Sequence, residues 1–580
     1  MKYKTLLKLL DNICYEAPSN YKTYKPKIDN QDAVNSARSK CFIHLYLKVK
    51  MGLLDFKERQ TYITEGPYDG GLDAYYINNE KRLIYLIQSK FRTNQNNFEE
   101  KELSLDDLIK METESIIQGE EVDSNGNRYN SKIINMQTKI NQIPDIARYK
   151  YKIIILGNLK RYNSTQISRI IGGLEYEIFD FERTYSELVL PMCKSNYYDT
   201  KEIEWIINIS DNDFKILNQQ FDTSIGKCNI HIAFIPLKSV AEFMLKFKNS
   251  VLQFNPRNYL DLARNSVNIS IEKSISSNKT NDFSLLNNGI TIVCSKFSHQ
   301  SSTGSSNNTQ VIVENTQIIN GGQTACTISK IKDKAFLTNK KVMIKFISAP
   351  TDDYENYLRF IDTISNATNL QTKVTEPDRK SNTLVQRQLQ IDIFMRYGYL
   401  YEIKKGEFGE VKDLLGKDNQ IINRIILTKC ITAFQGFCAR ARSESDSLFG
   451  EKFDDLFAKF NTSEIMLSYL CYSYLLSLKA TKRNGYLQTQ YGNALRYGKY
   501  AVIQAISVYI KNNIIKYDEN GITKIANDLT QNILNQWNQF EIFIQTKITN
   551  STYFNKNSDF GNYFKSKNAE NDIDDYNWMS

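Results

Sequence analysis

Apolar residues near the start of the chain follow two different periods, and each period predicts a different element. Within 31–50 they recur every three or four positions, so we predict a core-facing helix that Gly52 ends. Within 61–92 a Gly/Pro-rich approach leads into two β-rich runs, LDAYYI and RLIYLIQSKF, which a polar turn near residue 79 separates. The second segment is therefore predicted to form a β-hairpin.

An α/β pattern continues after the hairpin. A charged stretch at 98–118 has a helical pattern, a Gly/Asn-rich loop spans 123–130, and a further helix precedes the run YKIIILGN at 151–158. That run is short, apolar and bounded by polar residues, so it predicts a buried strand. A hairpin, a helix and another strand suit a compact α/β domain, which we expect to end between residues 185 and 225.

Three further segments follow. Residues 226–350 alternate β-like runs, such as NIHIAFIPL, GITIVCSKF, QVIVENTQIIN and KVMIKFISA, with helical or polar connections, and HQSSTGSSNNT is predicted to be a flexible surface loop. Residues 351–550 are mostly helical in pattern, and 551–580 form a polar tail that we predict to be mobile. The fold class predicted is α/β, with an N-terminal α/β domain over 1–205, a mixed α/β central region and a helical C-terminal region.

Composition narrows the class of protein. Of 580 residues, 41% are hydrophobic and 24% charged, which is typical of a folded globular protein. The start of the chain lacks the pattern of a signal peptide and no apolar stretch is long enough to cross a bilayer, so we expect a cytoplasmic protein with no membrane partner. A net charge of +9 is compatible with nucleic acid without proving it.

The cysteines and histidines argue against a sulfur or imidazole metal site. Nine cysteines are scattered without CxxC spacing, which predicts reduced, mostly buried thiols. The three histidines are far apart, and Cys41 and His44, one helical turn apart, are interpreted as core packing. Any metal chemistry must therefore use oxygen ligands.

The hairpin offers such ligands. Asp73 stands at the start of its first strand, whereas Gln88 and Lys90 lie two apart on the second strand and so share a face. Asp73 offers a carboxylate to Mg²⁺ and Gln88 a side-chain carbonyl, the main-chain carbonyl of Ile87 or Ser89 adds an oxygen, and Lys90 supplies a cation. A solvated turn would explain any one of these residues, but the combination favours a nuclease site.

The segments DGGLDAYYI and LIQSKF resemble the Mrr-like branch of the PD-(D/E)XK nuclease superfamily, whose motif is Gly-Gly-hydrophobic-Asp, a short hairpin, then Gln-x-Lys. The resemblance implies a restriction-endonuclease-like fold and Mg²⁺ or Mn²⁺ as cofactor. It also implies catalytic roles for Asp73, Gln88 and Lys90, with Asp73 and Gln88 as metal ligands.

This chain departs from that family at one position. The family usually carries an acidic residue on the helix before the hairpin, and here the helix offers only Asp32, at its start. Glu65 and Asp69, close to the hairpin, are the other candidates for a third acidic metal ligand.

Residues 254–460 resemble a second family, the AIPR family, named for abortive infection and phage resistance. The resemblance rests on FNPRNYL, FSLLNNGITIV, QIINGGQTAC and SNATNLQTKV, in that order, and continues weakly into YEIKKGE and ARARSESDSLFGEKFDDLF. Such proteins often carry an N-terminal nuclease domain, so the two resemblances support each other.

Two polar, Gly-rich turns in this second region are candidates for ligand binding, because exposed main-chain N–H groups could cradle a phosphate or a base. Their residues are Asn287, Asn288, Asn320, Gly321, Gly322, Gln323 and Thr324. Arg257, Gln371 and Lys373 could add side-chain contacts. Ordinary turns, with Gly chosen for positive φ, are an equal alternative.

The sequence therefore predicts a metal-dependent endonuclease that acts on DNA in anti-phage defence, while the AIPR region recognises substrate or senses infection. One alternative is a non-enzymatic nucleic-acid or nucleotide sensor with a degenerate nuclease domain. Another is a nucleotide switch on the Asn320–Thr324 loop that keeps the nuclease silent until its ligand arrives. The sequence does not decide whether the protein forms a homo-oligomer, and it indicates no partner protein.

Overall fold

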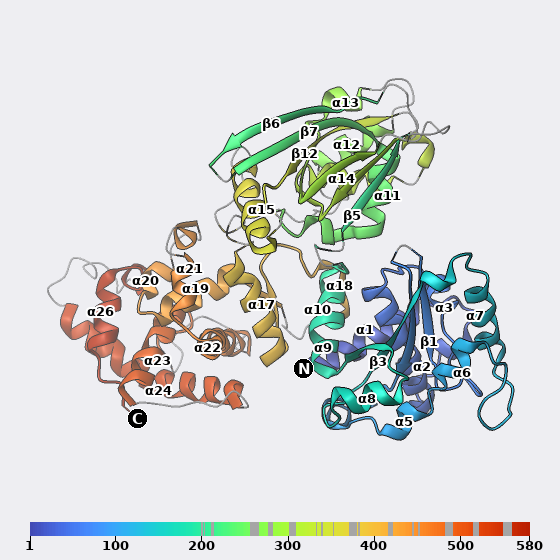
Figure 1. Ribbon diagram of the computed structural model, residues 1–580. Helices are drawn as coiled ribbons and strands as arrows, with labels where there is room; N and C mark the ends of the chain where they lie inside the picture. Colours follow the sequence, from blue (N-terminus) through green and yellow to red (C-terminus); the bar gives the residue numbers. More distant parts are fainter. Residues whose placement is uncertain are drawn as a thin grey trace.

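The computed structural model of the chain is a mixed α/β protein, as predicted, and Figure 1 shows three regions around a central junction. Sheets organise the N-terminal and central regions, whereas the C-terminal region is helical. The structure describes residues 1–579 except 80, 199–200, 202, 210–213, 225, 256–265, 277–281, 301–308, 332, 338–339, 352, 370–376, 378–379, 381–382, 416–420, 443–445, 451–452, 482–490, 514–520 and 549–559.

A sheet of order β1-β2-β3-β4 forms the N-terminal region. Its strands are β1 (Ala74–Asn78), β2 (Leu83–Ser89), β3 (Lys150–Leu156) and β4 (Glu175–Phe179). β1 and β2 form the predicted antiparallel hairpin, and β2, β3 and β4 run parallel. In β3, Ile153 and Ile155 pack into one apolar cluster while Ile154 and Leu156 pack into another, so both faces of this predicted strand are buried.

Helices cover this sheet on both faces. α2 confirms the helix predicted from apolar spacing: the Asn30 side chain accepts from the Ala33 N–H at its start, and Gly52, at φ +68°, follows its end. The helices are α1 (Lys2–Glu16), α2 (Gln31–Lys50), α3 (Phe56–Gln60), α4 (Gln95–Glu100), α5 (Leu105–Ile109), α6 (Thr113–Gln118), α7 (Ser131–Asn141), α8 (Ser164–Ile170), α9 (Phe181–Arg183) and α10 (Leu190–Lys194).

The continuous helical stretch predicted over 98–118 is wrong, because α4, α5 and α6 divide it. Ser104 begins a new helix by a capping box with Asp107, in which each side chain accepts from the other residue's main-chain N–H. Gly119, in the left-handed conformation, ends the third of these helices. This division places Asp107 beside the hairpin.

The central region contains a sheet of order β11-β8-β12-β7-β6 and a sheet of order β5-β10-β9. The strands are β5 (Glu204–Ile209), β6 (Leu217–Thr223), β7 (Gly226–Pro236), β8 (Ile290–Cys294), β9 (Lys296–Gln300), β10 (Thr309–Glu314), β11 (Gln317–Asn320) and β12 (Lys341–Ser348). The helices are α11 (Leu237–Phe247), α12 (Ser266–Ile275), α13 (Phe283–Leu286) and α14 (Gly322–Lys330), with a 3₁₀ turn, η5 (Lys248–Leu252). This region therefore includes two strands that precede residue 226.

Two of the predicted β runs each supply strands to both central sheets. GITIVCSKF contains β8 and the start of β9, and QVIVENTQIIN contains most of β10 and all of β11. The chain changes sheet at Ser295 and at Asn315, whose φ of +54° breaks the extended backbone. Most of HQSSTGSSNNT, predicted to be a flexible loop, lies outside the described residues.

The last region is mostly helical, as predicted, with one small parallel pair of strands, β13 (Leu400–Glu402) and β14 (Ile421–Asn423), that the pattern does not predict. Its helices are α15 (Tyr354–Asn369), α17 (Leu384–Tyr397), α18 (Gly409–Leu415), α19 (Arg424–Phe434), α20 (Cys438–Ala441), α21 (Phe453–Ala458), α22 (Thr462–Thr481), α23 (Lys499–Asn513), α24 (Ile522–Ile548), α25 (Phe560–Tyr563) and α26 (Lys567–Asp575).

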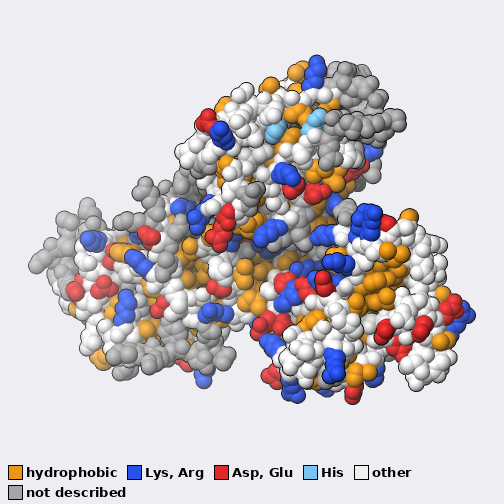
Figure 2. All heavy atoms as spheres, viewed as in Figure 1, with side chains coloured by type: hydrophobic (Ala, Val, Ile, Leu, Met, Phe, Trp, Pro, Cys, Tyr) orange, Lys and Arg blue, Asp and Glu red, His pale blue; other side chains and the backbone are white. Residues whose placement is uncertain are grey.

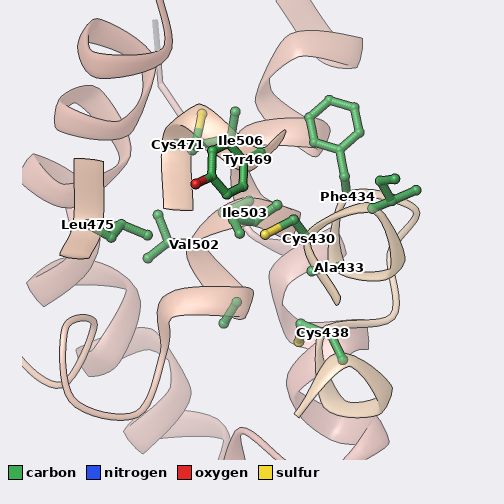
Figure 3. Close-up of a cluster of buried hydrophobic side chains, with 14 of the residues drawn as sticks. Cys430, Ala433, Phe434, Cys438, Tyr469, Cys471, Leu475, Val502, Ile503 and Ile506 are labelled. Carbon is green, nitrogen blue, oxygen red and sulfur yellow. The ribbon is translucent and has the colours of Figure 1, made fainter. Parts of the chain in front are cut away.

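A large apolar core joins these helices. Figure 3 shows side chains of α19, α22 and α23, among them Cys430, Tyr469 and Val502, gathered in one cluster. All nine cysteines of the chain are free and buried, so the predicted burial of the thiols is confirmed. Cys41 and His44 are fully buried as well, which confirms their interpretation as core residues.

The mobile polar tail predicted for 551–580 is wrong for the residues after 559. α25 and α26 pack onto the helical core, and Trp578 is buried with its ring 5.9 Å from that of Trp537. The few apolar residues of this segment are spread among many polar ones, so composition hides the packed face. Residues 551–559 lie outside the described part of the chain.

One segment of the C-terminal region completes the N-terminal core. Phe394, Phe408 and Val411 belong to the same apolar cluster as α1. Lys8 Nζ in α1 donates to the main-chain oxygen of Leu415 at 2.6 Å. Figure 1 shows α17 and α18 between the two regions, which consequently share a core.

Candidate functional site

Asp73 lies immediately before β1 and is bound to the end of β2. Its N–H donates to the main-chain oxygen of Ile87 at 3.0 Å, and its Oδ2 accepts from the N–H of Ser89 at 2.7 Å. The carboxylate is therefore held against the strand that carries Gln88, as the hairpin predicts.

The surroundings of Asp73 resist ionisation of its carboxyl group. Burial, together with the charges of Asp69 and Glu65, raises the pKa of Asp73 to about 7, although the Ser89 N–H and the Lys90 charge oppose this rise. A carboxyl group in a solvated turn would not be shifted in this way. The shift makes Asp73 a candidate functional residue.

Gln88 and Lys90 share a face, as predicted, and both contact Asp107. Gln88 Nε2 donates to the main-chain oxygen of Asp107 at 2.6 Å, and Lys90 Nζ lies 3.7 Å from Asp107 Oδ1. Since Nε2 is occupied, Oε1 is the available end of the Gln88 amide. It is buried and has no hydrogen-bond partner among the described residues.

Glu65 is the best placed of the three acidic candidates. Its Oε2 is buried without a partner in the described part of the chain, and burial raises the pKa of Glu65. The two carboxylate oxygens of Asp69 instead accept from the N–H groups of Gly66 and Gly71, at 2.9 and 3.0 Å. Asp69 therefore shapes the loop before β1, and Glu65 is left to bind a ligand.

Helix α2 does not present Asp32 to this site. Asp32 is exposed in the first turn of the helix. The α2 residue whose charge reaches Glu65 is Lys40, which lies eight positions further on, roughly 12 Å along the helix axis. Helix α2 thus brings the positive charge of Lys40 to Glu65.

The donor set suits a hard divalent cation. Carboxylates of Asp73 and Glu65 and the amide oxygen of Gln88 are the ligands that Mg²⁺ and Mn²⁺ prefer, and two of these side chains carry buried oxygens without partners. Within the described residues, no group of three or more His, Cys, Asp or Glu side chains could hold a metal ion. The fit therefore depends on Gln88 and a main-chain oxygen in place of a third carboxylate.

The two Gly-rich turns meet where β8 and β11 pair. Asn287 Nδ2 donates to Thr324 Oγ1 at 3.1 Å, which joins one turn to the other. Gly321 has φ +80°, and a Cβ there would lie 2.6 Å from the main-chain oxygen of Gly289. A Cβ on Gly322 would lie 3.0 Å from Asn255 Nδ2. Close packing thus explains these glycines without a ligand.

The polar side chains of the same turns are more accessible. Asn288 and Asn320 are exposed and Gln323 is half-buried, while Asn320 Oδ1 accepts from the N–H of Gly321 at 2.7 Å. The turns open at the start of α14, so main-chain N–H groups lie beside these side chains. Ligand binding by the turns stays a prediction.

Comparison with known families covers this part of the chain. A family model described as AIPR protein matches residues 252–552, more than half of the 580 residues. The chain belongs to the AIPR family. The AIPR match includes both Gly-rich turns and the helices as far as α24, so it confirms the resemblance seen over 254–460 and extends it. A search of curated proteins and a search of solved structures found no match.

Three residues predicted to contact a ligand in the AIPR region are not placed. Arg257, Gln371 and Lys373 lie outside the described residues. The hairpin site lies outside the matched range, so its assignment rests on its own geometry. Of the described helices of this AIPR protein, none is long and apolar enough to cross a bilayer.

Sequence reasoning missed two residues of the hairpin site. Asp107 contacts both Gln88 and Lys90, and Lys132 Nζ donates to the main-chain oxygen of Glu65 at 2.8 Å. Asp107 and Lys132 lie on helices that follow the hairpin in the sequence. No sequence motif specifies their spacing from the hairpin. The capping box at Ser104 was the one available signal that a helix starts beside the site.

Proposed function

We propose that the N-terminal region of this AIPR protein is a metal-dependent nuclease that hydrolyses phosphodiester bonds, with DNA as the favoured substrate, in anti-phage defence. The observation that carries the proposal is a half-buried Asp73 carboxyl group held beside a buried Gln88 oxygen that has no partner within the described residues. Membership of a family named for abortive infection and phage resistance supports the defence role.

Each residue of the hairpin site has a role in this proposal. Asp73, Glu65 and Gln88 would hold Mg²⁺ or Mn²⁺, which supplies a Lewis acid for the phosphate and a more acidic water. Lys90 is half-exposed, and its Nζ lies beyond hydrogen-bond distance of Asp107, so it can donate to a phosphate oxygen or to the attacking water. Asp107 lies beside Lys90 and orients the Gln88 amide.

The proposal is tested by incubating the purified full chain with plasmid DNA, single-stranded DNA and RNA, in Mg²⁺ or Mn²⁺ and in chelator. We expect metal-dependent cleavage, strongest on DNA, that Asp73→Asn abolishes. Asp123→Asn is the matched control, because Asp123 lies in the loop after α6 and its carboxylate accepts hydrogen bonds from Asn125 and Asn127 of the same loop. Absence of cleavage under all conditions would contradict the proposal, as would equal cleavage by the Asp73→Asn variant.

The second candidate function is a non-enzymatic nucleic-acid or nucleotide sensor with a degenerate nuclease site. The observation that favours it is that α2 brings the positive charge of Lys40 to Glu65, together with the absence of a three-carboxylate cluster within the described residues. Salt-sensitive nucleic-acid binding without cleavage in any metal would support the sensor over the nuclease.

A further inference from the structure

A small pocket lies where the three regions of the chain meet. We name it the junction pocket, and its volume is about 40 Å³, roughly the space of three waters. The residues that the argument uses are Lys194, Asn196, Gln253, Arg387, Lys404 and Glu407. On the visible face of the molecule, Figure 2 shows Lys and Arg side chains gathered where the central region meets the N-terminal region.

The lining carries an excess of positive charge. Lys194, Arg387 and Lys404 face one carboxylate, Glu407. Lys194 Nζ lies 3.2 Å from Glu407 Oε1 and donates to Gln390 Oε1 at 2.8 Å, so this pair neutralises itself. Arg387 and Lys404 have no further carboxylate in the lining, and Asp362, which acts on Arg387, lies outside it.

The Nζ group of Lys404 holds the chain together locally through hydrogen bonds. Its Nζ donates to the main-chain oxygens of Leu252, Gln253 and Asn255, the last at 2.8 Å. Burial and the nearby Arg387 charge lower the pKa of Lys404 well below its usual range. Asn255 of FNPRNYL is thereby joined to YEIKKGE, and all three N–H groups of Lys404 are used in these bonds.

Arg387 has no such set of acceptors. Its guanidinium stacks on the Phe254 ring at 4.0 Å, and its Nη2 is buried with no hydrogen-bond partner in the described structure. Burial lowers the pKa of Arg387 to about 10, although the charges of Asp362 and Glu407 oppose this effect. A buried guanidinium N–H without an acceptor costs free energy, which a bound anion would recover.

Asn196 provides a complementary group in the same lining. Its Oδ1 is buried and likewise lacks a partner among the described residues. The junction pocket thus offers an unused donor, Arg387 Nη2, and an unused acceptor, Asn196 Oδ1. A phosphate-type oxyanion with a hydroxyl group, as in hydrogen phosphate or a nucleotide, would satisfy both.

We propose that the junction pocket binds a phosphate-type oxyanion, either free phosphate or the phosphate end of a nucleotide, through Arg387 and Asn196. The ligand would hold the segment after α10 and helix α17 together, and so stabilise the junction of the N-terminal region with the AIPR region. The site is independent of the hairpin and of its proposed nuclease activity.

The test is calorimetric binding and thermal unfolding of the full chain with inorganic phosphate, pyrophosphate and ATP, against chloride at equal ionic strength. We expect a raised Tm and saturable binding with at least one of these probes. Arg387→Gln should weaken affinity at least about tenfold, because a charge-assisted hydrogen bond is lost. Arg396→Gln, an exposed arginine on the same helix, is the matched control and should bind like wild type.

The three probes separate the sources of the oxyanion: equal binding of phosphate and ATP points to free phosphate, and tighter binding of ATP points to a nucleotide. Asn196→Leu, which removes the unused acceptor and fills the pocket, should also lose binding and serves if Arg387→Gln fails to fold. Failure of all three probes to bind wild type would overturn the proposal. Wild-type affinity in a folded Arg387→Gln or Asn196→Leu variant would overturn it as well.

Discussion

The side-chain amide of Gln88 donates through Nε2 to the main-chain oxygen of Asp107 at 2.6 Å, and this bond fixes the orientation of the amide. The oxygen Oε1 is consequently the end presented to the buried site, where no group of the described chain donates to it. Asp107 also faces Lys90, so one residue of α5 positions two residues of the proposed nuclease site. The short helix α5, which the sequence pattern merged into one helical stretch over 98–118, is therefore part of the site.

Substitution Gln88→Met should remove the neutral ligand oxygen while keeping the volume of the side chain. Under the nuclease proposal we expect cleavage to fall at least roughly tenfold, with partial rescue by higher Mn²⁺ concentration, since metal affinity is what is lost. Cleavage rates across a metal titration would measure this. Gln95→Met changes an exposed glutamine that bonds to Glu99 and should leave the rate unchanged. An unchanged rate in Gln88→Met would remove Gln88 from the site.

The raised pKa of Asp73 predicts the direction in which the stability of the metal-free protein changes with pH. The folded state holds the proton up to about pH 7, whereas the unfolded chain loses it near 3.8, so stability falls as pH rises between these values. Asp73→Asn cannot ionise, so its Tm relative to wild type should be higher at about pH 8 than at about pH 5 in chelator. Thermal unfolding of both proteins at the two pH values tests this. A Tm difference that does not change with pH would contradict it.

His44 should make the fold sensitive to mild acid. Burial and the charge of Arg59 lower its pKa to about 3, Nδ1 accepts from Arg59 Nε, and Nε2 lies 3.1 Å from the Tyr24 hydroxyl, so the ring is neutral in the fold. Because unfolded histidine takes up a proton below about pH 6.5, stability is lost as pH falls. Between about pH 7 and pH 5 we expect a loss of about 2 kcal/mol from this group alone.

Denaturant unfolding at the two pH values measures that loss. His44→Gln should flatten the pH dependence, whereas His299→Gln, at an exposed position of β9, should leave it as in wild type. Equal pH dependence in wild type and His44→Gln would show that another group is responsible.

The shared core predicts that a residue of the AIPR region stabilises the N-terminal sheet. Phe408 is 1% exposed in the apolar cluster that contains α1, so Phe408→Ala should cost about 3–5 kcal/mol. Hydrogen exchange should show faster exchange in α1 and β2, hundreds of positions away in sequence. Phe437→Ala, at a residue 43% exposed, should have little effect on either. Unchanged exchange in the N-terminal region of Phe408→Ala would mean that the two regions unfold independently.

Sequence patterns predicted an element correctly where the residues that determine it lie within the same segment. The helix at 31–50, the hairpin at 61–92 and the strand at 151–158 carry their periodicity, caps and turns within the segment, and the structure has each of them. The same hairpin placed Asp73 against the strand of Gln88 and Lys90, because strand register follows from the turn.

Long-range packing is what the patterns could not show. Asp107 contacts the hairpin from a helix that follows it in the sequence, and α18 packs into the same core as α1. Neither contact could be predicted from the local sequence. The alternation of apolar residues continues through Ser295, where the chain passes from one central sheet to the other. The junction pocket likewise draws on three distant segments, and only the assembled fold brings Arg387 to Asn196.

The most direct measurement of the central claim is the rate of Mg²⁺-dependent DNA cleavage by wild type, Lys90→Met and Lys150→Met at equal concentrations of folded protein. Lys90 extends from the end of β2 at the proposed site, whereas Lys150 is exposed at the opposite end of the sheet. A nuclease centred on the hairpin predicts cleavage by wild type and Lys150→Met and almost none by Lys90→Met. Equal rates in all three proteins, or no cleavage by any of them, would contradict it.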